Sequence, residues 1–240
     1  MVTYIIKLKE RKEVAEGTTA FYFEKPADFR FKAGQYLVLS LIDPPETDSE
    51  GNDRTFSIAS APFENRLMVA TRMRNTAFKR VLRTLPAGAE VNMRGPFGSF
   101  ILHNSPSRPG VFLVGGIGIT PVRSIVLQAI RDKLPQPLYL FYSNRRPEDA
   151  AFLEDLEGAE KQNINYKLIG TMTQMAKSHR SWRGETGFVS RDMLAKFVKD
   201  VSAPIYYIIG PPGMVTAMRN VLGQAAVNDD DIRTEEFTGY

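Results

Sequence analysis

The pattern of apolar residues changes near residue 106, and this change constrains the fold more than any other feature of the 240-residue chain. Before it, short alternating runs such as Thr19–Glu24 and Tyr36–Leu41 are separated by turn residues, which predicts an antiparallel barrel or sandwich. After Ser105–Gly110, continuous apolar runs such as Val111–Val114 alternate with helical patterns. Strands that are buried on both faces and separated by helices predict a doubly wound parallel sheet.

We therefore expect two domains. An antiparallel β-barrel or sandwich should occupy residues 1–106, and an α/β domain with a doubly wound, parallel five-stranded sheet should occupy residues 107–240. In a doubly wound sheet, ligands bind beyond the carboxyl ends of the strands. The glycine-rich and polar segments that directly follow each strand are therefore the candidate binding residues of the second domain.

The composition narrows the possible kinds of site. Without cysteine, the chain cannot form disulfides, thiolate zinc sites or cysteine-ligated iron–sulfur clusters. Its two histidines, His103 and His179, are too few for a multi-histidine metal site, and we expect His103 on a surface turn. The net charge of +4 is too small to indicate nucleic-acid binding, and no apolar run approaches the ~20 residues of a membrane span. We expect a cytoplasmic protein, and any redox chemistry that it performs would depend on an organic cofactor.

The stretch Arg54–Ser57 combines a fixed cation, an aromatic ring and a small hydroxyl donor. In an extended strand, Arg54 and Phe56 point to one face, and Thr55 and Ser57 point to the other. A planar ligand with a phosphate could use these groups, because Arg54 would bind the anion, Phe56 would cover a ring and Ser57 would approach a ring nitrogen. By itself, however, the same pattern is typical of an ordinary sheet surface.

A short helix between the strands is a second candidate for anion binding. Asn75 or Thr76 can cap its start, and a helix start offers unpaired N–H groups. The basic residues nearby, Arg72, Arg74, Lys79, Arg80 and Arg83, form either a solvated face or a docking surface for an acidic protein. The acidic, proline-containing segment Asp43–Asp53 is expected to be a solvated loop without function.

Three segments follow predicted strands of the second domain. Gly115–Pro121 joins a strand to a helix, and its glycines would let the backbone approach a phosphate. Ser143–Arg146 offers a hydroxyl, an amide and two guanidiniums, which suit an adenosine ribose or its 2′-phosphate. In Gly210–Met214, two prolines fix the turn, and Gly210 leaves room for a planar ring.

Together, these segments resemble the ferredoxin–NADP⁺ reductase-like family, as a stand-alone two-domain member. Arg54–Ser57 looks like the family's Arg-x-Tyr-Ser flavin motif, and Gly115–Pro121 resembles its Gly-Gly-x-Gly-x-Thr-Pro nucleotide loop. Gly210–Met214 resembles its Gly-Pro-Pro-x-Met segment. Two positions depart from the family pattern, since Phe56 replaces the usual tyrosine and Ile209 replaces a cysteine.

The resemblance implies contacts for two cofactors. FAD would contact Arg54, Thr55, Phe56, Ser57, Thr71, Arg72, Met73, Asn75, Thr76, Ala77 and Phe78. NADPH or NADH would contact Gly116, Gly118, Thr120, Pro121, Ser143, Asn144, Arg145, Arg146, Gly210, Pro211 and Met214. Phe237 would stack on the flavin, Tyr240 would reach over FAD, and Ser57, Glu235 and Phe237 would form the catalytic set.

The activity implied by the resemblance is hydride transfer between nicotinamide C4 and flavin N5. Electrons would pass to or from a separate carrier such as ferredoxin or flavodoxin. One alternative is an NAD(P)H–flavin reductase or the reductase component of an oxygenase, and another is a flavin-binding subunit without its own turnover. The guanidiniums of Arg145 and Arg146 favour NADPH, although NADH stays open. The sequence does not predict the oligomeric state.

Overall fold

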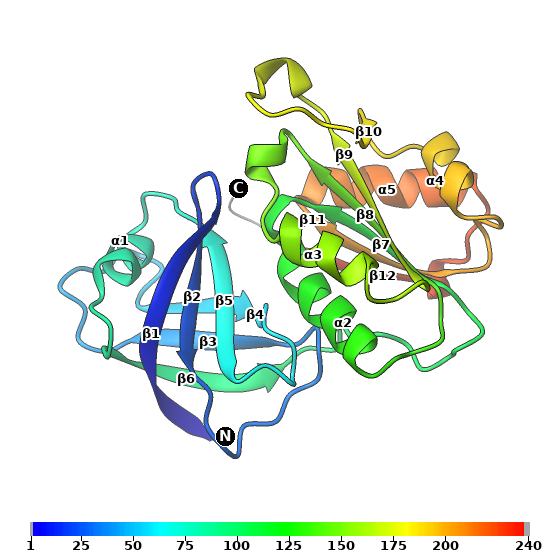
Figure 1. The fold of residues 1–240 in the computed structure, drawn as a ribbon. Helices are drawn as coiled ribbons and strands as arrows, with labels where there is room; N and C mark the ends of the chain where they lie inside the picture. Colours follow the sequence, from blue (N-terminus) through cyan, green and yellow to red (C-terminus); the bar gives the residue numbers. More distant parts are fainter. Residues whose placement is uncertain (1, 238–240) are drawn as a thin grey trace.

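The first half of the chain folds into an antiparallel barrel (Figure 1). The structure, a computed structural model, describes residues 2–237. The six strands are β1 (Thr3–Ala15), β2 (Thr18–Glu24), β3 (Tyr36–Leu41), β4 (Asp53–Ser57), β5 (Arg66–Arg72) and β6 (Glu90–Phe97), in the order β4-β3-β6-β1-β2-β5. The N–H of Ala59, just past β4, donates to the carbonyl of Met68 on β5 at 2.8 Å, so the two edges of the sheet meet.

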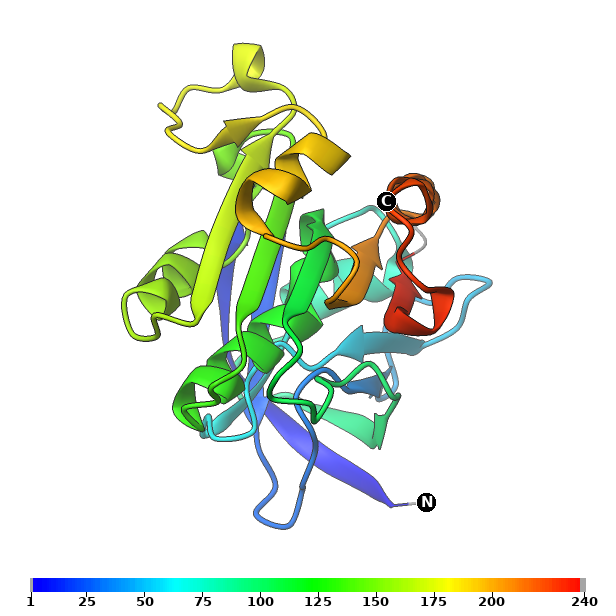
Figure 2. The same ribbon diagram turned by 90° about the vertical axis from the view of Figure 1, so that its right-hand side faces the viewer.

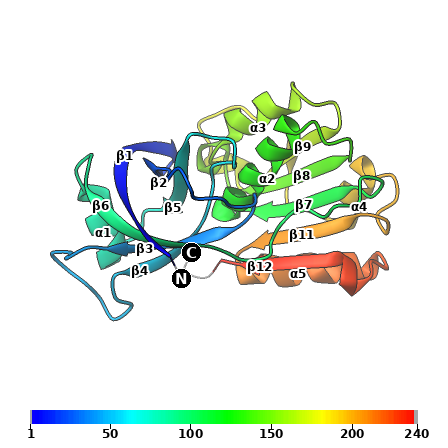
Figure 3. The same ribbon diagram turned by 90° about the horizontal axis from the view of Figure 1, so that it is seen from below.

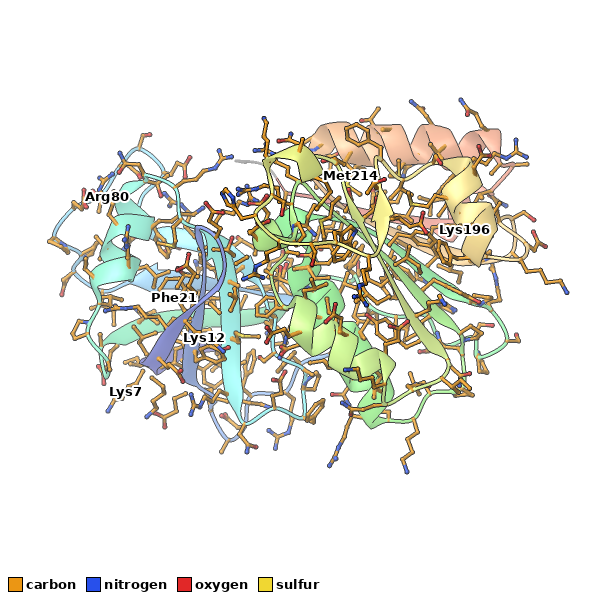
Figure 4. All side chains as sticks on the ribbon, turned by 45° about the horizontal axis from the view of Figure 1, so that its top comes forward. Lys7, Lys12, Phe21, Arg80, Lys196 and Met214 are labelled. Carbon is orange, nitrogen blue, oxygen red and sulfur yellow. The ribbon has the colours of Figure 1, made fainter. Side chains whose placement is uncertain are left out.

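Aromatic side chains fill the barrel. Phe21, Phe23 and Phe29 are almost completely buried, and Figure 4 shows Phe21 between the strands. Burial of each such ring stabilises the fold by about 2–3 kcal/mol. Helix α1 (Ala77–Thr84) covers one end of the barrel and places Phe78 and Leu82 in the same core.

The second half forms a parallel sheet. Its strands are β7 (Gly110–Gly115), β8 (Leu138–Asn144), β9 (Tyr166–Met172), β10 (Glu185–Thr186), β11 (Ile205–Gly210) and β12 (Ile232–Glu236), in the order β10-β9-β8-β7-β11-β12 (Figure 2). The predicted doubly wound parallel sheet is confirmed. The sixth strand, β10, was not predicted, because its two residues are too few to produce a periodic pattern.

Helices cover both faces of this sheet (Figure 3). They are α2 (Ile119–Arg131), α3 (Leu153–Glu160), α4 (Arg191–Phe197) and α5 (Pro212–Gln224), with short 3₁₀ turns η1 (Gly116–Gly118), η2 (Pro147–Asp149), η3 (Met175–Lys177) and η4 (Asp229–Asp231). The chain runs from β7 outward to β10 and then returns to the other side of β7 as β11. The strand order therefore reverses between β7 and β11, where doubly wound folds bind ligands.

Helix α2 joins the two domains. Arg123 donates to the carbonyl of Ala59 at 2.9 Å, and the Ser124 hydroxyl donates to the carbonyl of Ser60 at 2.7 Å. One apolar cluster contains Ala59 from the barrel together with Ile125 from α2. The domains therefore share a packed interface. The predicted boundary at residues 106/107 falls in the irregular segment between β6 and β7 and stays a prediction.

His103 is buried, so its expected position on a surface turn is wrong. The backbone N–H of His103 donates to the Tyr207 hydroxyl at 2.8 Å, and its ring lies 3.0 Å from both that hydroxyl and the carbonyl of Arg108. The histidine thus anchors the connection between the domains to β11, a contact across 104 positions that local sequence does not reveal. Within residues 2–237, no helix is both long and apolar enough to cross a membrane.

Candidate active site

Strand β4 presents the Arg54–Ser57 stretch beside α1. The guanidinium of Arg54 lies 5.2 Å from the centre of the Phe78 ring, and the Phe56 and Phe78 rings lie 5.9 Å apart, so Arg54 and Phe56 share a face as their spacing predicts. Phe56 is 8% exposed, which leaves only a small part of its ring for a ligand. Ser57 is also buried and pairs with Tyr36 of β3.

Both terminal nitrogens of the Arg54 guanidinium are bound by the segment that precedes it. Its Nη1 donates to the backbone carbonyls of Glu50, Gly51 and Asp53 at 2.7–3.0 Å. Its Nη2 lies 3.0 Å from the Asp48 carboxylate and 2.9 Å from the Glu50 carboxylate. The loop at residues 43–53 is therefore folded onto Arg54 rather than being merely solvated.

Asp48 connects Arg54 to the start of α1. One carboxylate oxygen accepts from Arg54 at 3.0 Å, and the other accepts from the backbone N–H of Ala77 at 3.0 Å. Burial acts to raise the pKa of Asp48, but the hydrogen bonds from Ala77 and Arg54 outweigh it and lower that pKa. An anion is thus held between a guanidinium and a helix start, the pair of groups that a phosphate requires. The residues present fit a cofactor phosphate, although a protein carboxylate fills the position in this structure.

The end of β5 lies next to this anion position. Thr71 is buried, and the backbone carbonyl of Arg72 accepts from Lys79 of α1 at 2.8 Å. The N–H of Met73 donates to the carbonyl of Gly17 at 2.8 Å. Thr76 caps α1, and Asn75 accepts from Arg80 at 2.8 Å. The residues from 54 to 78 that are predicted to contact FAD therefore all lie on β4, around the end of β5 or at the start of α1. Among them, Thr55 has an exposed side chain.

The two glycine-containing loops of the second domain meet where the strand order reverses. A Cβ atom on Gly115 would lie 2.4 Å from the Met214 sulfur, and one on Gly118 would lie 2.8 Å from the Ile209 carbonyl oxygen. Gly118 therefore requires glycine, because its neighbour is backbone, whereas a side chain at Gly115 would have to displace the flexible Met214 side chain. Figure 4 shows Met214 on α5 at this point. The Thr120 hydroxyl donates to the Ile117 carbonyl at 3.0 Å, so Thr120 stabilises its own turn.

The Ser143–Arg146 segment lies beside these loops, since Ser143 pairs with Gly115. Asn144 is buried, and its amide oxygen and nitrogen have no hydrogen-bond partner among the described residues. Such an orphaned amide suits a polar ligand. Arg145 is exposed, whereas Arg146 forms ion pairs with Asp149 and Glu16.

The C-terminal strand brings Glu235 and Phe237 to the same region. The N–H of Phe237 donates to the carbonyl of Gly210 at 3.0 Å, and its half-buried ring packs against the apolar cluster shared by the domains. Glu235 has one carboxyl oxygen that is buried without a partner among the described residues, and burial raises the pKa of this carboxyl to about 7. Tyr240 lies outside the described residues. A cavity of about 510 Å³ adjoins Glu235 and is lined by Gly34, Tyr36, Gly98, Ser99, Phe100, Arg233, Thr234 and Glu235.

The loop after β9 is held by a tryptophan. The Trp182 indole donates to the carbonyl of Glu185 at 2.8 Å. A Cβ atom on Gly170 would lie 2.7 Å from this ring, and one on Gly184 would lie 2.5 Å from it. The two glycines therefore form a slot that fits the indole and fixes the loop beside the end of β9.

Comparison with known proteins agrees with this geometry. Residues 112–220 match the model of a family described as the oxidoreductase NAD-binding domain. The chain is 28% identical over 186 residues to a component of the Na⁺-translocating NADH-quinone reductase of Pseudoalteromonas atlantica, covering 76% of this chain and 44% of that protein. It is 27% identical over 236 residues to the phenol hydroxylase P5 protein of Acinetobacter pittii, covering 97% of this chain and 64% of that protein. The chain thus spans about half to two thirds of the length of these relatives.

Solved structures share the whole fold. Ferredoxin–NADP⁺ reductase from Neisseria gonorrhoeae, solved with bound FAD and NADP, is 19% identical, with a TM-score of 0.80, and the match covers 98% of both chains. The flavohemoglobin of Malassezia yamatoensis, solved with bound FAD and haem, is 22% identical, with a TM-score of 0.82 over 99% of this chain and 60% of that one.

The barrel and the doubly wound sheet together form the two-domain fold of ferredoxin–NADP⁺ reductase, and the second domain matches the family of oxidoreductase NAD-binding domains. The matched residues begin in β7 and end in α5.

Proposed function

We propose that this protein is a flavoenzyme that transfers a hydride between NAD(P)H and FAD and exchanges electrons with a separate acceptor. The observation that carries this proposal is the Asp48 carboxylate, bound at once by Arg54 and by the N–H of Ala77. It marks a position built to hold an anion in the barrel domain, as the pyrophosphate of FAD requires. A cytoplasmic location, where NAD(P)H is supplied, is part of the proposal.

The barrel residues would bind FAD, which when bound supplies the two-electron chemistry that amino-acid side chains lack. Arg54 and the start of α1 would hold the pyrophosphate after Asp48 has moved away. Ser57 would orient the ring system through its hydroxyl, and the backbone of Thr71–Met73 would line it. Asn75, Thr76 and Phe78 would complete the wall, with Phe56 contributing its small exposed edge.

The second domain would bind the nicotinamide nucleotide where the strand order reverses. Gly116, Gly118, Thr120 and Pro121 would accommodate its phosphates, and Gly210, Pro211 and Met214 would seat the nicotinamide. At the adenosine end we propose Ser143, the orphaned amide of Asn144 and the exposed guanidinium of Arg145. Phe237 would cover the flavin until the nicotinamide displaces it. Tyr240 keeps its proposed place over FAD, and Glu235 would act as a buried acid near the reacting rings.

The acceptor is proposed to be a protein partner. Two relatives are named as a phenol hydroxylase protein and as the reductase subunit of a glycine betaine monooxygenase, and this favours an oxygenase component or a carrier such as ferredoxin or flavodoxin. Direct reduction of free flavin is the second candidate. Activity that depends on an added carrier supports the first candidate, and activity on free flavin alone supports the second.

The test is a visible spectrum of the purified protein with FAD, followed by anaerobic titration with NADPH and NADH separately. Bleaching of the bound flavin is the expected result, and the nucleotide that bleaches it faster is the preferred one. A flavin that binds but is bleached by neither nucleotide would leave a flavin-binding subunit without turnover. Failure to bind FAD would exclude the proposed flavoenzyme function.

A further inference from the structure

The turn between β1 and β2 touches both halves of the proposed site. On one side, the carbonyl of Gly17 accepts from the N–H of Met73, just past the end of β5. On the other side, the N–H of Glu16 donates to the carbonyl of Glu148 in η2 at 2.9 Å. A single turn of the barrel thus links the end of a proposed flavin-lining strand to the nucleotide-binding domain.

Charged side chains reinforce this link. Arg146 donates from Nε and Nη2 to the two carboxylate oxygens of Asp149 at 3.0 Å each, and Nη2 also donates to Glu16 at 2.8 Å. Arg72 of β5 approaches the same Asp149 carboxylate at 4.0 Å. Charges therefore alternate in sign along Glu16, Arg146, Asp149 and Arg72. Asp149 is only 9% exposed, so water screens its bidentate pair weakly.

The short turn η2 also holds the loop that follows β9. The Glu148 carboxylate accepts from the Ser178 hydroxyl and from the N–H groups of His179 and Arg180. Desolvation acts to raise the pKa of Glu148, but hydrogen bonds from its own N–H, from His179 and from Ser178, together with the charge of Arg146, outweigh it and lower that pKa to about 2. The carboxylate stays ionised at any physiological pH, so the loop stays attached to η2.

We propose that Glu16, Arg146, Asp149 and Arg72 form an interdomain clamp, and that Arg146 and Asp149 are positioning residues rather than nucleotide ligands. This inference rests on the proposed hydride transfer. A phosphate could bind the Nε–Nη2 edge of the Arg146 guanidinium only by displacing two carboxylates, and the displaced Asp149 would be left buried without its strongest partner. The clamp instead fixes the end of β8 relative to the end of β5. A shift of ~1 Å between reacting groups can slow a reaction by about 100-fold, so this spacing matters for hydride transfer.

The first test needs neither cofactor nor turnover. Amide hydrogen exchange is measured at Glu16 in the flavin-free protein, in wild type and in Asp149→Asn. Glu10→Gln is the matched control, because Glu10 of β1 is also an acidic residue that pairs with an arginine, Arg66, but it lies outside the clamp. We expect the Glu16 amide to be protected in wild type and in Glu10→Gln and to exchange at least about tenfold faster in Asp149→Asn. Equal exchange in all three proteins, or an unprotected wild type, would overturn the clamp.

The second test separates positioning from binding. Isothermal titration with ADP-ribose and with its 2′-phosphorylated form measures affinity, and stopped-flow bleaching at saturating NADH measures hydride transfer. In Arg146→Ala and Asp149→Asn, we expect affinities within about twofold of wild type and bleaching slowed by about tenfold or more. Arg146→Lys, which keeps the charge but not the bidentate fork, should recover part of the rate.

The opposite result identifies a ligand. If Arg146→Ala weakens binding of the 2′-phosphorylated compound by tenfold or more while bleaching at saturation is unchanged, Arg146 binds the nucleotide and the positioning role is excluded. If wild type does not bind FAD or is not bleached, the proposed function fails. The hydrogen-exchange result then still decides whether the clamp exists.

Discussion

The Asp48 carboxylate lies 3.0 Å from the backbone nitrogen of Ala77 and so occupies the position proposed for a cofactor phosphate. Any phosphate that binds there must displace a residue that is already ionised and hydrogen-bonded. The protein therefore contains its own competitor for this position, on the loop that is folded onto Arg54.

Replacing Asp48 by asparagine should strengthen FAD binding. The neutral amide competes less well for Arg54 and no longer repels the pyrophosphate, so we expect Kd to fall by about fivefold, equivalent to about 1 kcal/mol. Titration followed by flavin fluorescence measures Kd. Asp43→Asn, which removes an exposed charge from the same loop, should leave Kd within about twofold. Weaker binding in Asp48→Asn would mean that Asp48 supports the site instead of competing for it.

Glu235 should make stability fall as the pH rises. Its pKa is raised from 4.5 to about 7 in the folded protein, so between these values the folded state binds more protons than the unfolded state, and the free energy of unfolding decreases with pH. At about 1.36 kcal/mol per pKa unit, the loss between pH 5 and pH 8 is about 2.5 kcal/mol. Urea denaturation of Glu235→Gln should show this loss removed, whereas Glu236→Gln, an exposed neighbour, should retain it. Parallel pH profiles for Glu235→Gln and wild type would contradict the assignment.

Arg123 should be the most costly arginine to remove from α2. Its buried guanidinium donates to the Ala59 carbonyl and pairs with Glu64 at 2.9 Å and Asp155 at 2.7 Å. Arg123→Ala leaves these acceptors unpaired at the domain interface, and we expect a loss of about 2–4 kcal/mol in the free energy of unfolding. Arg131→Ala, on the exposed side of the same helix, should cost less than about 1 kcal/mol. Similar losses for the two variants would show that the interface does not depend on Arg123.

Phe237→Ala should strengthen nicotinamide binding if Phe237 covers the flavin. Its ring packs against the interdomain cluster and must move away before a nicotinamide can stack on the flavin. The alanine variant does not need the free energy that displaces this ring. We expect about a three- to tenfold lower Kd for NAD⁺, measured by difference spectra of the flavin-loaded protein. Phe237→Tyr, which retains the ring, should bind as wild type does. Unchanged or weaker binding by Phe237→Ala would exclude the gating role.

Local sequence was sufficient for the parts of the fold that depend on periodicity. The strand–turn–helix order around Gly115–Pro121 predicted the parallel sheet, and the joint occurrence of short motifs predicted the family. The relation of Arg54 to Phe56 followed from the two-residue period of a strand, and both side chains do reach Phe78.

Contacts between distant residues could not be predicted in this way. Asp48 meets Ala77 across 29 positions, and Arg146 meets Glu16 across 130. Because one sequence records which groups are present but not which of them tertiary folding brings together, Arg146 was indistinguishable from the exposed Arg145. Burial of His103 was hidden for the same reason, since its partner Tyr207 belongs to a strand near the other end of the chain.

The slot formed by Gly170 and Gly184 holds Trp182, whose intrinsic fluorescence can report on the protein. Trp182 is the single tryptophan of the sequence, so all indole fluorescence originates from the loop beside β9. Without an attached dye, its emission reports whether that loop keeps its position beside β9 when a nucleotide binds. Quenching of the Trp182 emission would also show energy transfer from this residue to a bound reduced nicotinamide.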